Sequence, residues 1–325
     1  MAADYGLTRL SQQGGMGGAK DSAEQQEEEP IWEIHNSLLD EDGGGRLHAE
    51  NIEGVEGAFL VPDLLTDAEC TRLLELSSRL GFSSGRTLVE VPTSVRQNDV
   101  SLLVPPVAMV TELARRLSPF VPCNGHGGGK RTDPDFINRR WRVYRYLPPG
   151  AAAANAAPGS APDSTGSFFK PHYDAAQPRS GVANGELIDD EPPKGVVRLS
   201  QMSVLLYLTG GHRGGHTVFY PSGQAGEGKP GEEEEGGAPV VRIKVAPRKG
   251  AALVFWHGRH PLSPLHEGAP LEVSASSGTT LAPKVVIRTD VLFATEAPQA
   301  NSNAWTSSNY VAAMLHASRL QADGH

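Results

Sequence analysis

Two stretches in the first half of the chain carry apolar residues at helical spacing. Residues 66–80 open with Thr66 and Glu69, which have the spacing of a capping box, where each side chain binds a backbone amide of the first turn. Residues 106–117 place their apolar side chains on one face. The predicted inward positions are Leu73, Leu74 and Leu76 in the first helix, and Val107, Val110, Leu113 and Leu117 in the second. The pattern therefore predicts two amphipathic helices.

From residue 136 onward the pattern changes to that of β-strands. Residues 141–146 alternate, so Trp141, Val143 and Arg145 face one side and the residues between them face the other. Residues 201–208 are almost all apolar, which is typical of a strand buried on both faces. Further strands are predicted at 57–62, within 87–104, and at 217–221, 240–245, 251–256 and 284–293. Helices followed by many strands predict a mainly β (α+β) fold, an antiparallel double-sheet barrel buttressed by N-terminal helices.

Low-complexity segments divide the chain into three parts. Residues 1–54 form a leader, of which 1–30 hold too little apolar surface to fold, and folded structure is expected to begin near Val55. Residues 55–295 form one folded domain, and 296–325 form a tail in which residues 311–320 have the pattern of a short helix. Surface loops are predicted at 148–166, 175–195 and 222–238.

Charge and composition narrow the class of protein. The net charge of −9 argues against a non-specific nucleic-acid binder, although arginines cluster between residues 139 and 145. Cys70 and Cys123 are too few for a disulfide-stapled secreted fold or a cysteine-rich zinc site. The chain shows no signal-peptide pattern and no apolar run long enough to cross a bilayer. We therefore expect a soluble intracellular protein of the cytoplasm, with the nucleus as the alternative.

The candidate chemistry starts at His172 and Asp174, which follow the aromatic pair Phe168 and Phe169. In an extended strand, residues two apart project from the same face, so an imidazole nitrogen and a carboxylate oxygen can point at one metal ion. With a second histidine they would form the 2-His-1-carboxylate facial triad of non-haem Fe(II), which leaves positions open for substrate and O2. The pair alone is a common coincidence, so other parts of the chain must complete the site.

The second histidine must come from a different strand. The candidates are His212, His216, His257, His260 and His266. His266 is favoured because it opens the segment that leads into the last predicted strand, where a side chain can face the mouth of a barrel. The others stay open as alternatives, although a histidine in a loop is more often exposed and inert.

Such an iron site also needs a basic residue further in, to bind a dicarboxylate co-substrate. Lys284 and Arg288 share one face of the predicted strand 284–293. Either could pair with a distal carboxylate, lysine as a point charge and arginine through a bidentate fork. A buried cation without such a partner would be costly. The alternative is that both side chains face outward.

A set of short motifs occurs in one order along the chain. They are Phe169–Asp174, Leu205–Leu208, Gly214–Phe219, Gly250–Phe255 and His266–Gly268, preceded by residues 142–146 and followed by 284–293. In this order they resemble the prolyl 4-hydroxylase-type branch of the Fe(II)/2-oxoglutarate-dependent dioxygenases, over about residues 55–295. Each motif is weak alone, whereas the ordered set is specific.

The resemblance implies a double-stranded β-helix, or jelly roll, with His172, Asp174 and His266 as iron ligands. It also implies that Lys284 binds the C5 carboxylate of 2-oxoglutarate, with Arg288 as the second candidate. Other positions that match the lining of the 2-oxoglutarate pocket are Tyr146, Tyr207 and Thr217. The implied cofactors are Fe(II), 2-oxoglutarate and O2, with L-ascorbate (vitamin C) re-reducing the iron.

The predicted function is that of a dioxygenase which hydroxylates a peptidyl proline or another protein side chain and converts 2-oxoglutarate to succinate. Its partner would be a protein or peptide, with no membrane and no nucleic acid, and its oligomeric state is open. One alternative is the same iron chemistry on a small molecule or a nucleic acid. Another is a jelly-roll binding module without catalysis, but the complete set His172, Asp174 and His266 argues against it.

Overall fold

The computed structural model describes residues 6–12, 31–41, 46–84, 95–151, 166–189, 196–221, 241–272 and 282–296. The helices are α1 (Asp67–Arg79), α2 (Val107–Leu117) and the short 3-10 helix η1 (His126–Gly128). The strands before α2 are β1 (Leu7–Gln12), β2 (Ile31–Ile34), β3 (Glu50–Asn51), β4 (Phe59–Val61), β5 (Ser83–Ser84) and β6 (Asp99–Val104). The later strands are β7 (Lys130–Arg131), β8 (Trp141–Tyr146), β9 (Phe169–His172), β10 (Ser180–Ala183), β11 (Glu186–Asp189), β12 (Val196–Tyr207), β13 (Thr217–Tyr220), β14 (Ile243–Val245), β15 (Ala252–Trp256), β16 (Leu265–Gly268) and β17 (Lys284–Glu296).

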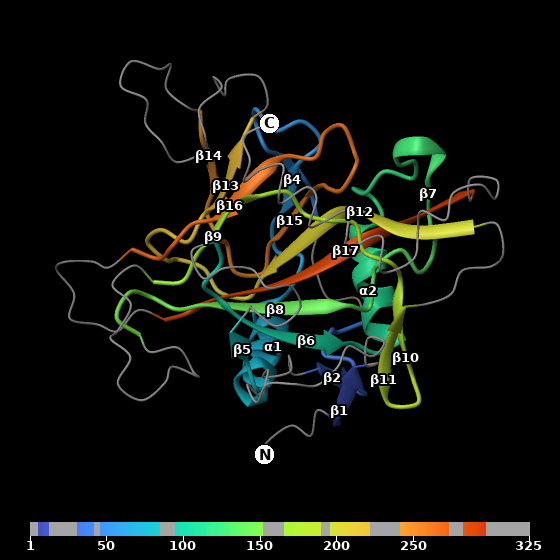
Figure 1. Ribbon diagram of the computed structural model, residues 1–325, viewed down its shortest axis with the longest axis horizontal. Coiled ribbons are helices and arrows are strands. Elements are labelled where there is room, and N and C mark those ends of the chain that lie inside the picture. The colour runs from blue at the N-terminus through green and yellow to red at the C-terminus, as the bar shows by residue number, and fades with distance from the viewer. Residues whose placement is uncertain are drawn as a thin grey trace, which may run out of the picture.

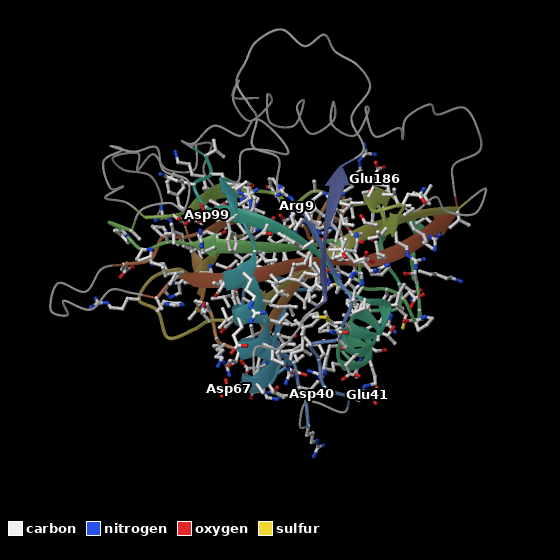
Figure 2. All side chains as sticks on the ribbon, turned by 90° about the horizontal axis from the view of Figure 1, so that it is seen from below. Arg9, Asp40, Glu41, Asp67, Asp99 and Glu186 are labelled. Carbon is white, nitrogen blue, oxygen red and sulfur yellow. The ribbon has the colours of Figure 1, made fainter. Side chains whose placement is uncertain are left out.

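Both predicted helices are confirmed, and α1 begins with the predicted capping box. The amide of Glu69 donates to Thr66 Oγ1 at 3.2 Å, and the amide of Thr66 donates to Glu69 Oε2 at 2.7 Å. Leu73 and Leu76 of α1 are fully buried, and Leu74 is half-buried. Figures 1 and 2 show both helices against the same face of the larger sheet.

The strands form one sheet of 13 and one of 4. The centre of the larger sheet has the order β8-β17-β12-β15, and the smaller sheet has the order β14-β13-β16-β9. From β8 onward the chain alternates between them, with β8, β12, β15 and β17 in the larger sheet and β9, β13 and β16 in the smaller. Figure 1 shows the smaller sheet on the side of the molecule away from the helices. This alternation is the connectivity of a double-stranded β-helix, so the predicted mainly β jelly-roll fold with helical support is confirmed, without a closed barrel among the described strands.

The period-2 pattern of each strand divides the core into two layers. On β8, Trp141 and Val143 join the cluster that α1 and α2 cover, while Tyr144 and Tyr146 join the cluster between the two sheets. The second cluster also contains Phe219 from the smaller sheet. The inner faces of the two sheets therefore pack toward each other, so polar residues on those faces lie between the sheets.

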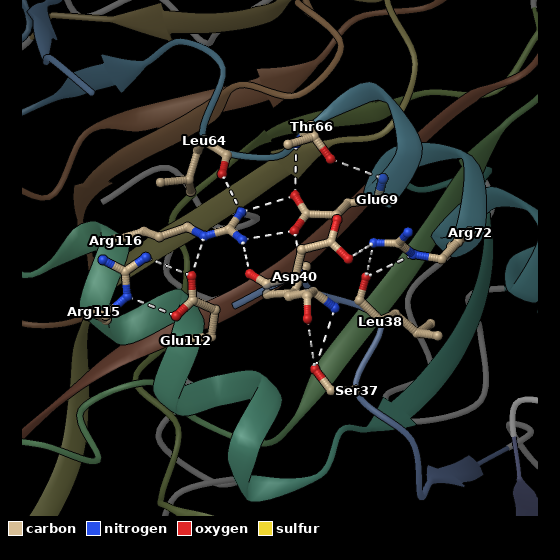
Figure 3. A network of polar contacts seen from close by, with 11 residues as sticks. Ser37, Leu38, Asp40, Leu64, Thr66, Glu69, Arg72, Glu112, Arg115 and Arg116 are labelled. Atoms are coloured by element: carbon tan, nitrogen blue, oxygen red, sulfur yellow. Dashed lines mark hydrogen bonds and ion pairs between the residues drawn. The ribbon is translucent and has the colours of Figure 1, made fainter. Parts of the chain in front are cut away.

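A buried ion-pair network ties the helices together (Figure 3). Arg116 of α2 donates to the two carboxylate oxygens of Glu69 at 2.9 and 2.7 Å, and to Glu112 at 2.7 Å. It also donates to the carbonyl oxygens of Leu64 and Asp40, at 2.8 Å each. All five N–H groups of this buried guanidinium thus have an acceptor. The network therefore holds α1 and α2 against each other and against the segment before α1 that contains Asp40 and Leu64.

Replacement of Arg116 with methionine is expected to lower the free energy of unfolding by about 3–5 kcal/mol, because Glu69 would keep a buried carboxylate without its cation. Urea denaturation followed by circular dichroism measures the loss. The matched control is Arg115→Ala, which removes an exposed partner of Glu112 and should cost about 1 kcal/mol or less. Equal losses in the two variants would contradict a structural role for the buried pair.

The structure differs from the sequence expectation at three places. Val107, predicted to face inward, is the first residue of α2 and is 55% exposed, whereas Val110, Leu113 and Leu117 are buried. Residues 175–195, expected to be a loop, contain the antiparallel hairpin β10–β11, whose turn has Asn184 and Gly185 at φ of 53° and 76°. Both residues favour positive φ, so they suit the two-residue turn that joins these strands. The folded chain also begins before the expected boundary at Val55, because β2 pairs with β6 and buries Ile31 and Ile34.

Several expectations lie outside the described residues. They concern residues 1–5 and 13–30 of the leader, most of the loop 148–166, the loop 222–238 and the tail after residue 296. Within the described part of the chain, no helix has the length and apolar character needed to cross a membrane.

Candidate metal centre

Two histidines meet across the smaller sheet. His172 ends β9 and His266 lies in β16, where the two are direct cross-strand partners with ring centroids 4.4 Å apart. His172 Nδ1 lies 2.7 Å from the carbonyl oxygen of Lys170, and His266 Nδ1 lies 3.1 Å from that of Pro264. A carbonyl oxygen can only accept, so each Nδ1 carries the proton. Both Nε2 lone pairs are therefore left for a metal.

Asp174 adds an oxygen donor to the pair. Its Oδ1 lies 3.7 Å from His172 Nε2, and its Oδ2 lies 3.6 Å from His266 Nε2. One ligand atom from each residue lies within 4.8 Å of the others, and this is the only such group of three or more His, Cys, Asp or Glu among the described residues. Two imidazole nitrogens and one carboxylate oxygen on one side match the donor set of the Fe(II) facial triad.

The electrostatics keep these groups in the state that a metal needs. Burial lowers the pKa of His266 to about 3, so its ring is neutral at physiological pH. Burial alone would raise the pKa of the Asp174 carboxyl, but the guanidinium of Arg288, 2.6 Å away, holds it well below its usual range. His172 is the most accessible of the three, since its side chain is 18% exposed. The residues fit a divalent ion, because metal binding requires neutral imidazoles and an ionised carboxylate.

Every site residue predicted from the sequence lines one cavity, whose empty space is about 430 Å³ when the part open to solvent is included. The predicted members are Tyr146, His172, Asp174, Tyr207, Thr217, His266, Lys284 and Arg288. The cavity is also lined by Tyr144, Phe169, Leu205, Glu267, Gly268 and Val286. At Gly268 an added Cβ atom would lie 2.7 Å from the hydroxyl of Tyr146, so the close approach of this tyrosine requires glycine.

Lys284 is a buried cation in this cavity. It is 2% exposed, and its Nζ donates to the carbonyl oxygen of Gly215 at 2.7 Å. The Nζ lies 4.6 Å and 5.9 Å from the ring centroids of Tyr146 and Tyr207. No ion pair joins Lys284 to a carboxylate of any residue that the structure describes, and burial lowers its pKa to about 7. Within the described part of the chain the ammonium therefore lacks an anionic partner, and a bound carboxylate could supply one.

Arg288 faces the same cavity but is already paired. Its Nη1 donates to Asp174 Oδ1 at 2.6 Å, and its Nη2 donates to Asp290 Oδ1 at 3.1 Å. Of the two basic residues predicted from the sequence, only Lys284 has no carboxylate partner among the residues that the structure describes. Near it, the hydroxyls of Tyr207 and Thr217 are 2.8 Å apart.

The other candidate histidines have different surroundings. His260 stacks on Trp256 at 3.7 Å, and its Nδ1 accepts from the amide of Leu262. His212 lies 3.0 Å from the hydroxyl of Thr209, and His216 is half-buried in the same turn. His257 is buried beneath Asp174 and contacts Ser200 and Ser203 rather than the ligand group.

Sequence reasoning missed part of the site. Ser203 and Asp290 lie in the apolar strands β12 and β17, both are fully buried, and Ser203 donates to Asp174 Oδ2 at 2.6 Å. The available signal was a small polar or charged residue within an otherwise apolar strand, which must have a buried partner.

No protein-family model and no curated protein matches the chain. Among solved structures, the chain is similar to a viral collagen prolyl hydroxylase from Paramecium bursaria Chlorella virus-1 in complex with 2OG, with 16% identity, coverage of 73% of this chain and 96% of the other, and a TM-score of 0.39. It is similar to a Pseudomonas putida prolyl-4-hydroxylase with 16% identity, coverage of 72% and 92%, and a TM-score of 0.37. It is also similar to an oxidoreductase of the 2OG-Fe(II) oxygenase family from Burkholderia pseudomallei, with 14% identity, coverage of 74% of this chain and 84% of the other, and a TM-score of 0.38. These likenesses concern the fold alone and establish no shared reaction.

Proposed function

We propose that this chain is an Fe(II)- and 2-oxoglutarate-dependent dioxygenase that hydroxylates a peptidyl proline or another protein side chain. One observation carries the proposal: a complete facial donor set lines the same cavity as a buried ammonium that has no carboxylate partner among the described residues. The donor set accounts for a metal with open positions. The ammonium accounts for a ligand that carries a second, distal carboxylate.

Different residues of the cavity would hold the metal and the co-substrate. His172, Asp174 and His266 would hold the iron through two Nε2 atoms and one carboxylate oxygen. Lys284 would bind the C5 carboxylate of 2-oxoglutarate. It lies on β17 four residues before Arg288, the partner of Asp174, so the Cα atoms of the two basic residues are about 13 Å apart along the strand. When bound, the iron would couple the conversion of 2-oxoglutarate and O2 to succinate and CO2 with transfer of one oxygen atom to the substrate. L-ascorbate is proposed as the reductant that supports turnover.

The accessible side of the donor set supports a macromolecular substrate. Phe169 stacks on the half-buried ring of His172 with the centroids 3.5 Å apart, and the neighbouring Tyr173 is 50% exposed. An apolar rim at the protein surface can admit a single side chain of a larger molecule. A nucleic-acid substrate is less favoured, because the nearby arginines already have acidic partners. The pairs are Arg139–Glu33 at 3.8 Å, Arg140–Asp189 at 3.6 Å and Arg145–Asp99 at 2.6 Å.

A spectroscopic experiment tests the cofactor assignment. Anaerobic addition of Fe(II) and 2-oxoglutarate to the folded protein is expected to give a weak visible charge-transfer band, because the keto acid chelates the metal. Succinate, which has both carboxylates but no keto group, is the matched control and should give none. If folded protein shows no band with 2-oxoglutarate, the proposed function is wrong.

A second experiment addresses the substrate. Peptides from a cell lysate incubated with the enzyme, Fe(II), 2-oxoglutarate and ascorbate are compared by mass spectrometry with the same lysate lacking 2-oxoglutarate. We expect proline, or another side chain, to gain one oxygen atom only in the complete mixture. Oxygen transfer confined to small molecules or nucleotides would contradict the protein-substrate assignment.

A further inference from the structure

A second layer of buried polar residues lies beneath Asp174, on the larger sheet. It contains Ser200 and Ser203 of β12, His257 just after β15, and Asp290 of β17, none of which lines the cavity. All of them are buried, with exposures of 0 or 1%. Buried polar groups are costly unless they are hydrogen-bonded, and in this layer Asp290 Oδ2 has no partner among the described residues, whereas the serines and His257 do.

A β-bulge brings the two serines to the same side. The register of β12 against β17 shifts between Ser200 and Met202, so Gln201 is an extra residue in β12. In a regular strand, Ser200 and Ser203 are three positions apart and would face opposite sides of the sheet. The bulge turns both toward His257, which lies 2.8 Å from each hydroxyl.

The hydrogen bonds in this layer run in one direction. Asp174 is ionised and can only accept, so the hydroxyl of Ser203 donates its one proton to Oδ2 at 2.6 Å. The Ser203 oxygen must then accept from His257, so Nδ1 of that ring carries the proton. The amide of Gln177 donates to Ser200 at 2.8 Å, which leaves the Ser200 hydroxyl free to donate to His257 Nε2. This ordering needs a neutral ring, and burial lowers the pKa of His257 accordingly.

The other oxygen of Asp174 is held separately. Arg288 donates to Oδ1 at 2.6 Å, and Asp290 in turn accepts from Arg288 Nε at 3.3 Å and Nη2 at 3.1 Å. The carboxylate thus has one fixed donor on each oxygen, so rotation about its last side-chain bond would break two short hydrogen bonds. Each oxygen still has a second lone pair that can bind a metal.

We propose that Ser203 and His257 are positioning residues that fix the orientation of the Asp174 carboxylate for the metal. The inference rests on the proposed function, because it takes Asp174 to be an iron ligand. Neither residue touches the metal or the substrates: Ser203 acts through Asp174, and His257 acts through Ser203. The layer orients the Asp174 carboxylate already in the metal-free protein. Removing either residue should therefore weaken metal binding itself and not only turnover.

The test measures metal affinity in the full-length protein without 2-oxoglutarate. Co(II) is titrated anaerobically into metal-free protein and followed by its visible d–d absorption. Ser203→Ala and His257→Leu are each expected to weaken Co(II) binding about 10- to 100-fold, the range for outer-shell partners of metal ligands. His257→Asn should bind Co(II) more tightly than His257→Leu, because its amide nitrogen can donate to Ser203 from the place of Nδ1.

The matched control is Ser77→Ala in α1. Ser77 is a buried serine whose hydroxyl donates to the carbonyl oxygen of Leu73 at 2.7 Å, so this variant loses a comparable buried hydrogen bond away from the site. Its Co(II) affinity should equal that of the wild type. If Ser77→Ala weakens binding as much as Ser203→Ala, the effect is one of general stability and the inference is overturned.

The remaining outcomes separate the inference from the function on which it rests. If the wild type binds Co(II) and both Ser203→Ala and His257→Leu bind it equally well, the inference is overturned and the proposed function stands. If the folded wild type does not bind Co(II), both the proposed metal site and the inference about Ser203 and His257 are wrong. If His257→Leu does not fold, Ser203→Ala decides alone, because it removes only one oxygen atom.

Discussion

Alanine in place of His266 is expected to abolish succinate formation while the fold is retained. His266 supplies one of the two imidazole nitrogens, and its loss leaves His172 and Asp174 as an incomplete donor set. We expect activity to fall by more than about 100-fold, since outer-shell partners of metal ligands alone contribute 10- to 100-fold. His172→Ala and Asp174→Ala should behave alike. Succinate formation and bound iron per protein are measured together with circular dichroism.

His260→Ala is the matched control for this prediction. His260 is close to His266 in the sequence and was a candidate ligand, but it stacks on Trp256 outside the donor group. The control should keep its iron and most of its activity. If His260→Ala lost both while His266→Ala kept both, the third ligand would be His260, and the site geometry described above would be wrong.

Methionine in place of Lys284 is expected to weaken 2-oxoglutarate binding strongly and to stabilise the ligand-free protein. Truncating one partner of a buried charge pair costs about 2–5 kcal/mol, which corresponds to roughly a 30- to 5,000-fold rise in Kd. Without the ligand, however, the Lys284 ammonium is buried and meets no carboxylate of the described residues, so removing it should raise the melting temperature. Calorimetry gives the Kd, and thermal unfolding without ligand gives the stability.

Lys249→Met provides the control, because Lys249 forms a partly exposed ion pair with Asp67 at 2.9 Å, away from the cavity. It should change neither the Kd nor the melting temperature appreciably. A Kd for 2-oxoglutarate that is unchanged in Lys284→Met would exclude Lys284 as the anchor. Weaker binding in Arg288→Met alone would instead point to Arg288.

The same lysine predicts a pH dependence with opposite signs for stability and binding. Burial lowers its pKa from 10.5 to about 7, so between these values the unfolded chain binds a proton that the folded chain does not. The free energy of unfolding should therefore rise with pH over this interval, since the burial cost applies in full only below about pH 7. Affinity for 2-oxoglutarate should fall as pH rises through 7. The difference between wild type and Lys284→Met isolates both effects.

Much of the fold could be predicted because local patterns agree with the tertiary arrangement. The capping box of α1 satisfies its own amides, and the alternation in β8 already separates the side chains of the two core layers. The hairpin β10–β11 was missed although Asn184 and Gly185 mark its turn, because its strands are only four residues long and their apolar residues, such as Val182 and Leu187, are only half-buried. β2 was missed because it has only four residues, and Ile31 and Ile34 are buried only once β2 lies between β1 and the distant β6.

The sequence by itself determined which residue types could carry the chemistry. The spacing of His172 and Asp174 follows from the two-residue period of a strand, and the motif order points to His266 and to a basic residue on the strand beginning at Lys284. The first is a property of one short segment and the second comes from the family resemblance carried by the motif order, so neither needed knowledge of distant contacts. The sequence could not choose between Lys284 and Arg288, because both lie on the same face of that strand.

Only the tertiary structure shows the different surroundings of those residues. Arg288 is set against Asp174 and Asp290, whereas Lys284 is buried beside tyrosines and has no acidic partner among the described residues. This difference in surroundings is why we propose Lys284, and not Arg288, as the residue that binds the ligand carboxylate. The layer of Ser203 and His257 depends on a bulge in β12 and on residues more than 50 positions apart. Charge pairing and hydrogen-bond direction are set by which atoms meet in space, and a linear pattern does not contain that information.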